Sequence, residues 1–178
     1  MQPKTFIAKD GRKVVLRPPK WEDLEGLMEY INSLVDEKAE IVLTKKVTRE
    51  EEAEWLRKRL ISIDKSDVIH VVAEVNGEVV AGAEVGKQKY RMSHVGMLGI
   101  GIKSGFRGIG IGTVIMKTLI EESRKAGLKV LVLDVFDTNN IAKELYEKMG
   151  FKEAGKIPKG ICKNGKYIDL VRMALELS

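Results

Sequence analysis

The segment from Met97 to Gly112, MLGIGIKSGFRGIGIG, constrains the fold of this chain more than any other. It begins as an apolar strand, breaks at Lys103-Ser104-Gly105 and leads into a helix from about Gly112 to Lys125. Three glycines at alternate positions of the turn leave its backbone amides open to a ligand. The positive end of the helix dipole points at the same place. The segment therefore predicts a strand–turn–helix unit that binds an anion, a phosphate or pyrophosphate.

Two common phosphate-binding motifs do not fit this segment. A Rossmann turn needs G-x-G-x-x-G, whereas the spacing here is G-x-G-x-G. A P-loop needs Lys and then Ser or Thr after its second glycine, but Gly110 is followed by Ile111 and Gly112. Arg107 adds a permanent charge with forked donors, which suits an oxyanion.

What the segment resembles is the R-x-x-G-x-G signature of the GNAT superfamily of acetyl-CoA-dependent N-acetyltransferases. Arg107, Gly110 and Gly112 stand at the signature positions. Further along, Asn140 to Phe151 (NIAKELYEKMGF) matches the second signature of that family, N-x-A-x-x-L-Y-x-x-x-G-F, at the expected distance. Both signatures occur in order, and the resemblance covers nearly the whole chain.

The resemblance implies an α/β protein with the GNAT (acyl-CoA N-acyltransferase) fold, and we expect residues 1–178 to be a single domain. The sheet is expected to be mixed, mostly antiparallel and flanked by helices. It should splay between the strand His94 to Lys103 and the buried strand Lys129 to Phe136. The hydrophobic pattern predicts further strands at 13–17, 68–75, 78–88, 151–157 and 167–177, helices at 21–35, 48–63 and 140–149, and a loop at 159–165.

Acetyl-CoA is the cosubstrate that the resemblance implies. Its pantetheine arm would pair with a strand backbone that glycines allow to bend, and its pyrophosphate would lie on the amides of the glycine turn. Asn140 would hold the pantetheine region or cap its helix, and these two roles stay open. The residues expected at this site are Ile100, Gly101, Ile102, Arg107, Gly108, Ile109, Gly110, Ile111, Gly112, Thr113 and Asn140.

Tyr146 is the candidate general acid, because the family places a tyrosine here whose hydroxyl reaches the sulfur of CoA. An ordinary tyrosine pKa near ~10 keeps the hydroxyl protonated at neutral pH, as an acid requires. The alternative is a core tyrosine, since Ala142, Leu145 and Met149 share the apolar side of its helix.

Two residues are candidates for the general base. His94 stands at the head of its strand and belongs to the residue type that titrates near neutral pH, although a histidine there is often exposed or structural. Glu84, on the preceding strand, would act directly or through water. His70, mid-strand among valines, is interpreted as structural. Asp169 either faces the acceptor or pairs with a lysine.

Composition narrows the partners. The chain has 44% hydrophobic and 32% charged residues, a net charge of +5 and one cysteine, Cys162, which we interpret as incidental. We expect no metal site, no nucleic acid and no membrane partner, because metal-ligand spacing, basic runs with aromatics and apolar runs of ~20 residues are absent. The N-terminus lacks an apolar signal region, so a cytoplasmic protein is expected. Whether the protein forms a homodimer stays open.

The function expected is transfer of an acetyl group to a primary amine by direct attack in a ternary complex. The acceptors favoured are the α-amine of an amino acid or peptide, then a protein amine, then a polyamine. A non-catalytic acyl-CoA sensor or scaffold of the same fold would keep the glycine turn without needing Tyr146. A nucleotide-binding domain is a second alternative, and it predicts competition of ATP or NAD with CoA.

Overall fold

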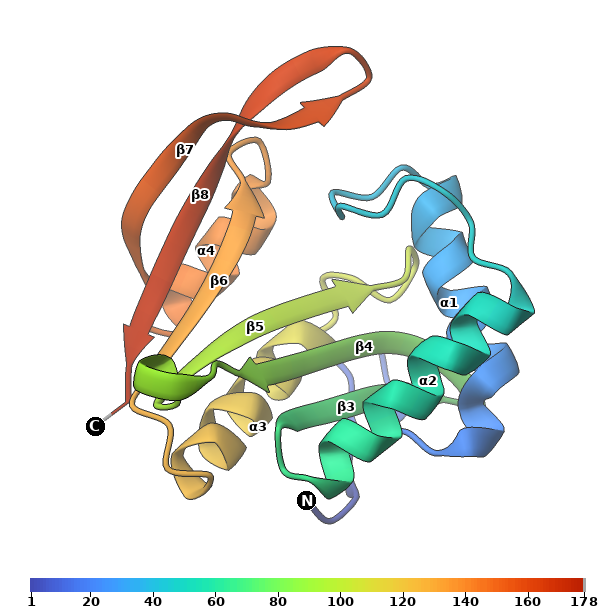
Figure 1. The fold of residues 1–178 in the computed structure, drawn as a ribbon. Coiled ribbons are helices and arrows are strands. Elements are labelled where there is room, and N and C mark those ends of the chain that lie inside the picture. The colour runs from blue at the N-terminus through green and yellow to red at the C-terminus, as the bar shows by residue number, and fades with distance from the viewer. Residues whose placement is uncertain (178) are drawn as a thin grey trace.

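The computed structural model describes residues 1–177, which form one sheet of eight strands with helices on both faces (Figure 1). The strands are β1 (Lys4–Ile7), β2 (Lys13–Arg17), β3 (Val68–Val75), β4 (Glu78–Lys87), β5 (Val95–Ile102), β6 (Val130–Phe136), β7 (Lys152–Lys163) and β8 (Lys166–Glu176). The helices are α1 (Leu24–Asp36), α2 (Arg49–Asp64), α3 (Ile111–Lys125) and α4 (Asn140–Lys148), with 3₁₀ turns at Trp21–Asp23 and Tyr90–Met92.

The sheet has the order β1-β2-β3-β4-β5-β6-β8-β7, and every neighbouring pair is antiparallel except β5 and β6. The parallel pairing of β5 with β6 covers only Val95–Met97 and Val130–Val132. Beyond it, β5 follows β4 to Ile102 while β6 follows β8 to Phe136, so the two strands diverge (Figure 1). The expected splayed, mixed α/β sheet is confirmed.

Two apolar cores flank the sheet. The larger one packs α3 and Tyr146 of α4 on one face, with Ile115, Met116 and Leu119 fully buried. The smaller one packs α1 and α2 on the other face around Leu56 and Val72. Figure 1 shows α1 and α2 on the side of the sheet opposite α3. The cores hold the sheet between two helical layers, as the alternation of strands and helices predicts.

Local residue patterns explain where several of these elements begin or end. Thr48 and Glu51 form the capping box that begins α2, with bonds of 3.3 Å from the Glu51 amide to the threonine hydroxyl and 2.8 Å from the Thr48 amide to the glutamate. Asn76 and Gly77 both have positive φ and close the β3–β4 hairpin. The crossover from β5 through α3 to β6 joins the two strands that pair in parallel.

The sequence prediction was wrong at three places. It missed β1, a four-residue edge strand with no clear alternation. The loop expected at 159–165 is instead the end of β7 and a tight turn at Asn164-Gly165, because a register shift between Ile157 and Ile161 absorbs Pro158 and Gly160. The first helix begins at Leu24 after a 3₁₀ turn, and not at Trp21.

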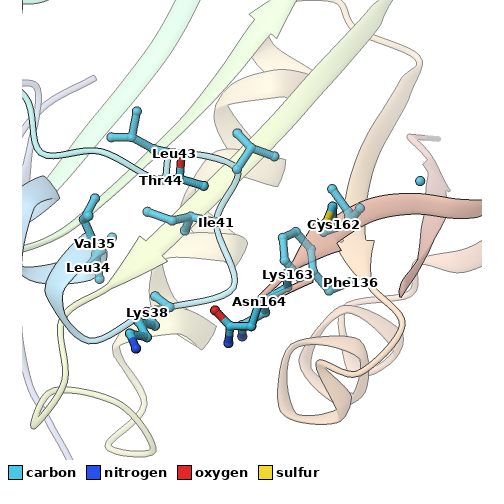
Figure 2. A pocket seen from close by; sticks show the side chains of 14 residues that line it. Leu34, Val35, Lys38, Ile41, Leu43, Thr44, Phe136, Cys162, Lys163 and Asn164 are labelled. Atoms are coloured by element: carbon cyan, nitrogen blue, oxygen red, sulfur yellow. The ribbon is translucent and has the colours of Figure 1, made fainter. Parts of the chain in front are cut away.

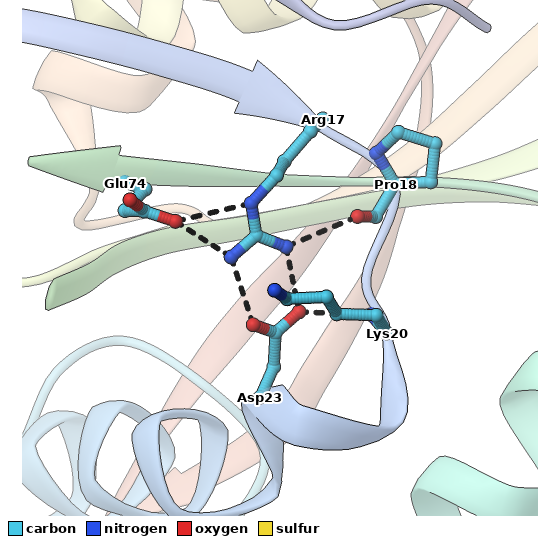
Figure 3. Close-up of polar contacts among 5 residues, drawn as sticks. All are labelled: Arg17, Pro18, Lys20, Asp23 and Glu74. Carbon is cyan, nitrogen blue, oxygen red and sulfur yellow. Dashed lines mark hydrogen bonds and ion pairs between the residues drawn. The ribbon is translucent and has the colours of Figure 1, made fainter. Parts of the chain in front are cut away.

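An ion cluster fixes the start of α1 against the sheet (Figure 3). Arg17 at the end of β2 donates to both carboxylate oxygens of Asp23, at 2.7 and 2.8 Å, and to Glu74 on β3, at 2.7 and 3.0 Å. The Lys20 amide donates to Asp23 at 2.8 Å. The Asp23 side chain is only 6% exposed. The cluster therefore anchors the helix that carries one wall of the site described next.

Candidate active site

The glycine turn has the geometry of an anion cradle. Gly105, Gly108 and Gly110 have φ of 81°, 74° and 95°, values that favour glycine, and Gly110 precedes the first residue of α3. Within residues 1–177, none of the amides from Gly108 to Thr113 donates a hydrogen bond. Free amides at the positive end of a helix favour a phosphate, so these residues fit the pyrophosphate of the implied cosubstrate.

The turn between β1 and β2 supports this cradle, and sequence analysis missed it. The Lys9 amide donates to the Ile109 carbonyl at 3.0 Å. Arg12 donates to the Gly105 carbonyl at 2.7 Å and lies over the Phe106 ring at 4.3 Å. The Lys9 side chain also passes Gly110, which brings a cation to the cradle. A contact between residues 9 and 109 leaves no local signal in the sequence.

Arg107 connects the cradle to α1. Its Nε donates to the Ile102 carbonyl at 2.7 Å, and its Nη2 pairs with Glu37 directly after α1. Its side chain remains 49% exposed. Arg107 therefore connects the glycine turn to the end of α1. Its contact with a phosphate stays a prediction.

The strand β5 offers backbone to a ligand along its C-terminal half. Ile100, Gly101 and Ile102 pair with β4 on one side, but β6 has already separated on the other. Gly99 and Gly101 lie on the α1 side of the sheet and differ in their surroundings. A Cβ at Gly101 would collide with the Tyr30 hydroxyl oxygen and lie 2.9 Å from Leu34, whereas one at Gly99 would meet nothing within 4 Å. Gly101 therefore makes room for Tyr30, and Gly99 leaves open space.

This contrast gives a test by substitution. Gly101→Ala should destabilise the fold by about 2 kcal/mol, because it overpacks two buried side chains, and lower the melting temperature by roughly 4–8 °C. Gly99→Ala, the matched control, should melt within about 2 °C of the wild type. Thermal unfolding of the two variants measures both effects. Equal destabilisation by the two alanines would contradict the packing described here.

Tyr146 lies on α4 in the larger core, 7% exposed, with its ring centroid 6.1 Å from that of Phe151. Burial raises its pKa to about 12, so the hydroxyl is protonated at neutral pH. Leu145 beside it packs close to Gly112 at the start of α3, which places α4 next to the cradle. The acid role stays a prediction. The helix cap is Asn139, whose side chain accepts from the Ala142 amide at 3.1 Å, so the capping role considered for Asn140 was wrong.

The two candidate bases lie at different places along β5. His94 is exposed and precedes β5 where β5 and β6 are still paired, and its carbonyl accepts from the Lys129 amide at 2.8 Å. Gly99 lies five residues along, about 16 Å away at the usual rise of a strand. Glu84 lies directly opposite Gly99 on β4. The geometry therefore favours Glu84 over His94 as the group beside the open part of the strand.

Within residues 1–177, Asp169 forms no ion pair with a lysine side chain, and its role toward the acceptor stays a prediction. Its carboxylate accepts from the backbone amide of Lys159 at 2.9 Å, which stabilises the irregular part of the β7–β8 hairpin. Among residues 1–177, no group of three His, Cys, Asp or Glu side chains is arranged to hold a metal ion. None of the helices in that part of the chain has the length and apolar character needed to cross a bilayer.

A cavity of about 300 Å³ lies between the α1–α2 segment and the β7–β8 hairpin (Figure 2). Apolar side chains stand in both walls, with Leu34, Ile41 and Leu43 on one side and Phe136 and Ile161 on the other, and polar side chains line the cavity beside them. The two charged residues that line it are Lys38 and Lys163, and no acidic residue does. Cys162 is exposed and also lines the cavity.

Glu40 connects the two walls of this cavity. It accepts from the Thr138 hydroxyl at 2.6 Å, before α4, and pairs with Lys163 of the hairpin at 3.5 Å. Together with the Arg107–Glu37 pair, it attaches the α1–α2 segment to both arms of the splayed sheet. The α1–α2 segment therefore contacts both the cavity and the glycine turn.

Comparisons with known proteins agree with this arrangement. The profile described as "Acetyltransferase (GNAT) family" matches residues 29–151. The chain is 28% identical over 170 residues to a Bacillus subtilis protein named "Putative phosphinothricin acetyltransferase YwnH", covering 93% of this chain and 100% of that one. It is 32% identical over 114 residues to the Escherichia coli L-amino acid N-acetyltransferase AaaT, covering 62% and 70%. The crystal structure of a ribosomal-protein-alanine N-acetyltransferase from Brucella melitensis superposes with a TM-score of 0.81 at 29% identity, covering 91% and 99%.

Proposed function

The chain belongs to the acetyltransferase (GNAT) family, whose members move an acetyl group from acetyl-CoA to an amine, and we propose that its acceptor is the α-amine of an amino acid or of a peptide N-terminus. The observation that carries this proposal is the cavity between the α1–α2 segment and the hairpin. The apolar residues in both walls suit a side chain, and Lys38 suits a carboxylate or a peptide carbonyl, whereas Lys163 already pairs with Glu40. A polycationic amine would be repelled by Lys38, which has no acid among the described lining residues to offset it.

The names of two relatives agree with this acceptor class. One is named as an L-amino acid N-acetyltransferase and the other as acting on phosphinothricin. Both names describe those proteins, and they support the proposal for this chain through similarity alone. The second choice, a protein amine, would enter the same cavity.

The cradle from Gly108 to Thr113, with Arg107 and Lys9 beside it, would hold the pyrophosphate, and the free edge of β5 at Ile100 to Ile102 would pair with the pantetheine arm. Bound acetyl-CoA supplies the acetyl group as a thioester. Glu84 faces the open part of β5, where it would accept a proton from the acceptor amine. Tyr146 would donate a proton to the departing sulfur, because its raised pKa keeps the hydroxyl protonated. Attack is direct, in a ternary complex.

An acetyl-CoA consumption assay tests the proposal. The panel contains leucine and methionine, their carboxamides, a peptide with a free apolar N-terminal residue, and spermidine. We expect kcat/KM for the best amino acid or peptide to exceed that for spermidine at least about tenfold, roughly 1.4 kcal/mol of discrimination by the charges of the cavity. Preference for spermidine would contradict the acceptor class. Tight binding of acetyl-CoA without turnover of any amine would favour the sensor alternative.

A further inference from the structure

All four helices of residues 1–177 end in the same kind of turn. The residue after the helix cap has a positive φ, its amide donates to the carbonyl three residues before it, and the next amide donates to the carbonyl five residues before its own position. This is the Schellman motif, in which glycine is favoured because it has no Cβ to strain a left-handed backbone. The residues at this position are Lys38, Ser66, Gly127 and Gly150, with φ of 52°, 59°, 79° and 95°. Lys38 and Ser66 therefore stand where the backbone conformation alone would favour glycine.

Lys38 differs from Ser66 in what surrounds it. Lys38 lines the cavity between the α1–α2 segment and the hairpin, as does Leu34 of α1 (Figure 2). Leu34 also lies 2.9 Å from a Cβ built at Gly101, so this wall of the cavity rests on β5. Ser66 follows α2, just before β3, and does not line the cavity. A residue that departs from the favoured type at the wall of a cavity indicates a function for its side chain.

The charge of Lys38 has no partner within residues 1–177. Three acids lie within two residues of Lys38 in the sequence, and each of them pairs with a different cation. The pairs are Asp36 with Lys46, Glu37 with Arg107, and Glu40 with Lys163. The amide of Lys38 is used in the turn, but its ammonium donates to no side chain or carbonyl in this part of the chain. Lys38 therefore brings an unpaired positive charge to the cavity, whereas Lys163 brings a paired one.

An unpaired ammonium at the cavity that takes the acceptor favours an anionic group on that acceptor. A lysine forms a stronger hydrogen bond with a carboxylate than with a neutral carbonyl, because both partners are then charged. The cavity volume of about 300 Å³ is at the lower end of the range for ligand cavities, which suits one amino acid better than several residues of a peptide.

We propose that Lys38 is a specificity residue that binds the α-carboxylate of the acceptor, so that the acceptor is a free amino acid and not a peptide N-terminus. The inference rests on the proposed function and narrows it. In a peptide the first residue has a neutral carbonyl in place of that carboxylate, and a polyamine has neither. No step of acetyl transfer depends on Lys38, whose ammonium decides only which amine is held.

Acetyl transfer to leucine, to leucinamide and to a peptide that begins with leucine tests the inference, because these acceptors share one side chain and differ at the carboxylate. We expect kcat/KM of the wild type for leucine to be at least about tenfold above that for either neutral analogue. Lys38→Met removes the ammonium and keeps much of the length of the side chain. It should lower kcat/KM for leucine about tenfold or more, through KM, and leave kcat/KM for leucinamide within about threefold. Lys38→Arg, which keeps the charge, should retain most of the preference for leucine.

Lys38→Gly separates the function of this side chain from its place in the turn. Glycine relieves the left-handed backbone, so we expect the melting temperature to rise by about 2–4 °C while the preference for leucine is lost. Ser66→Gly, the matched control in the same motif at the end of α2, should give a similar rise and keep the wild-type kinetics. A purely structural role of Lys38 does not produce a gain of stability together with a loss of specificity.

A wild-type ratio of leucine to leucinamide turnover in Lys38→Met would overturn the inference. Equal or better turnover of the leucine peptide by the wild type would also overturn it, while the wider acceptor class, an α-amine, would stand. If the wild type acetylates no amine of the panel, or only spermidine, the proposed function fails and the inference fails with it.

Discussion

Tyr146→Phe should lower kcat by about 10²-fold or more and leave the dissociation constant for acetyl-CoA within about twofold of the wild type. The hydroxyl makes no hydrogen bond within residues 1–177, so the variant loses no internal partner, and the packing against Phe151 is kept. The thiolate then leaves without a proton donor, which raises the barrier by about 2.7 kcal/mol for a hundredfold loss. Steady-state kinetics and equilibrium binding of acetyl-CoA measure the two quantities separately.

The pH dependence gives a second readout of the same residue. Burial raises the pKa of Tyr146 to about 12, so the acid form persists over the whole range in which the enzyme is assayed. We therefore expect no alkaline decline of kcat from this group between about pH 7 and 10. Tyr90→Phe, at a 91% exposed tyrosine before β5, is the matched control and should turn over normally. A wild-type rate in Tyr146→Phe would mean that Tyr146 only packs in the core and is not the general acid.

The parts of the site that the sequence predicted correctly depend on backbone conformation over a few residues. The glycine turn after β5 and the capping box of α2 are such parts, because local residue types decide them. The position of Asn140 shows the limit of this reasoning. Two consecutive asparagines compete for one cap, and Asn139 takes it. A local pattern does not choose between neighbours of the same type.

The parts that the sequence did not predict depend on register and long-range contact. A two-residue hairpin at Asn76-Gly77 that pairs Val75 with Glu78 would, without irregularity, place His70 opposite Ala83. A register shift between Ala73 and Glu74 moves the pairing by one residue, so His70 meets Glu84 instead. A shift of one residue exchanges the two faces of a strand, and no feature of residues 68–75 predicts it. The sequence analysis interpreted His70 as structural because it lies mid-strand among valines, and that pattern does not indicate its cross-strand partner.

The attachment of Lys9 and Arg12 to the glycine turn is of the same kind. The strand β1 before them has four residues and lies at the edge of the sheet, where packing selects few apolar side chains. The hairpin of β1 with β2 is therefore difficult to predict from the sequence. It nevertheless places Lys9 and Arg12 beside the glycine turn. The sequence predicted the glycine turn but not the contacts from the β1–β2 hairpin that support it.

Arg17→Met should be the most destabilising of the substitutions considered, with a loss of about 3 kcal/mol and a fall in melting temperature of roughly 6–12 °C. Methionine keeps most of the side-chain volume and leaves Asp23, 6% exposed, without its guanidinium partner (Figure 3). The same change at Arg172, which pairs with Asp134 on an exposed face of the sheet, is the matched control. It should cost no more than about 1 kcal/mol, because its side chain is 46% exposed.

The pH dependence of this difference distinguishes a charge effect from a packing effect. Burial acts to raise the pKa of Asp23, but the hydrogen bonds from Arg17 and the Lys20 amide outweigh it, and the pKa lies below its usual value. A depressed carboxyl pKa stabilises the fold above the unfolded value of ~3.9, and this contribution is lost as the pH falls through the folded value. In Arg17→Met the buried carboxyl is unpaired and gains stability on protonation. Urea unfolding should therefore show the difference in unfolding free energy between wild type and variant narrowing as the pH falls below about 4, whereas a difference that is constant with pH would mean that Arg17 acts by packing alone.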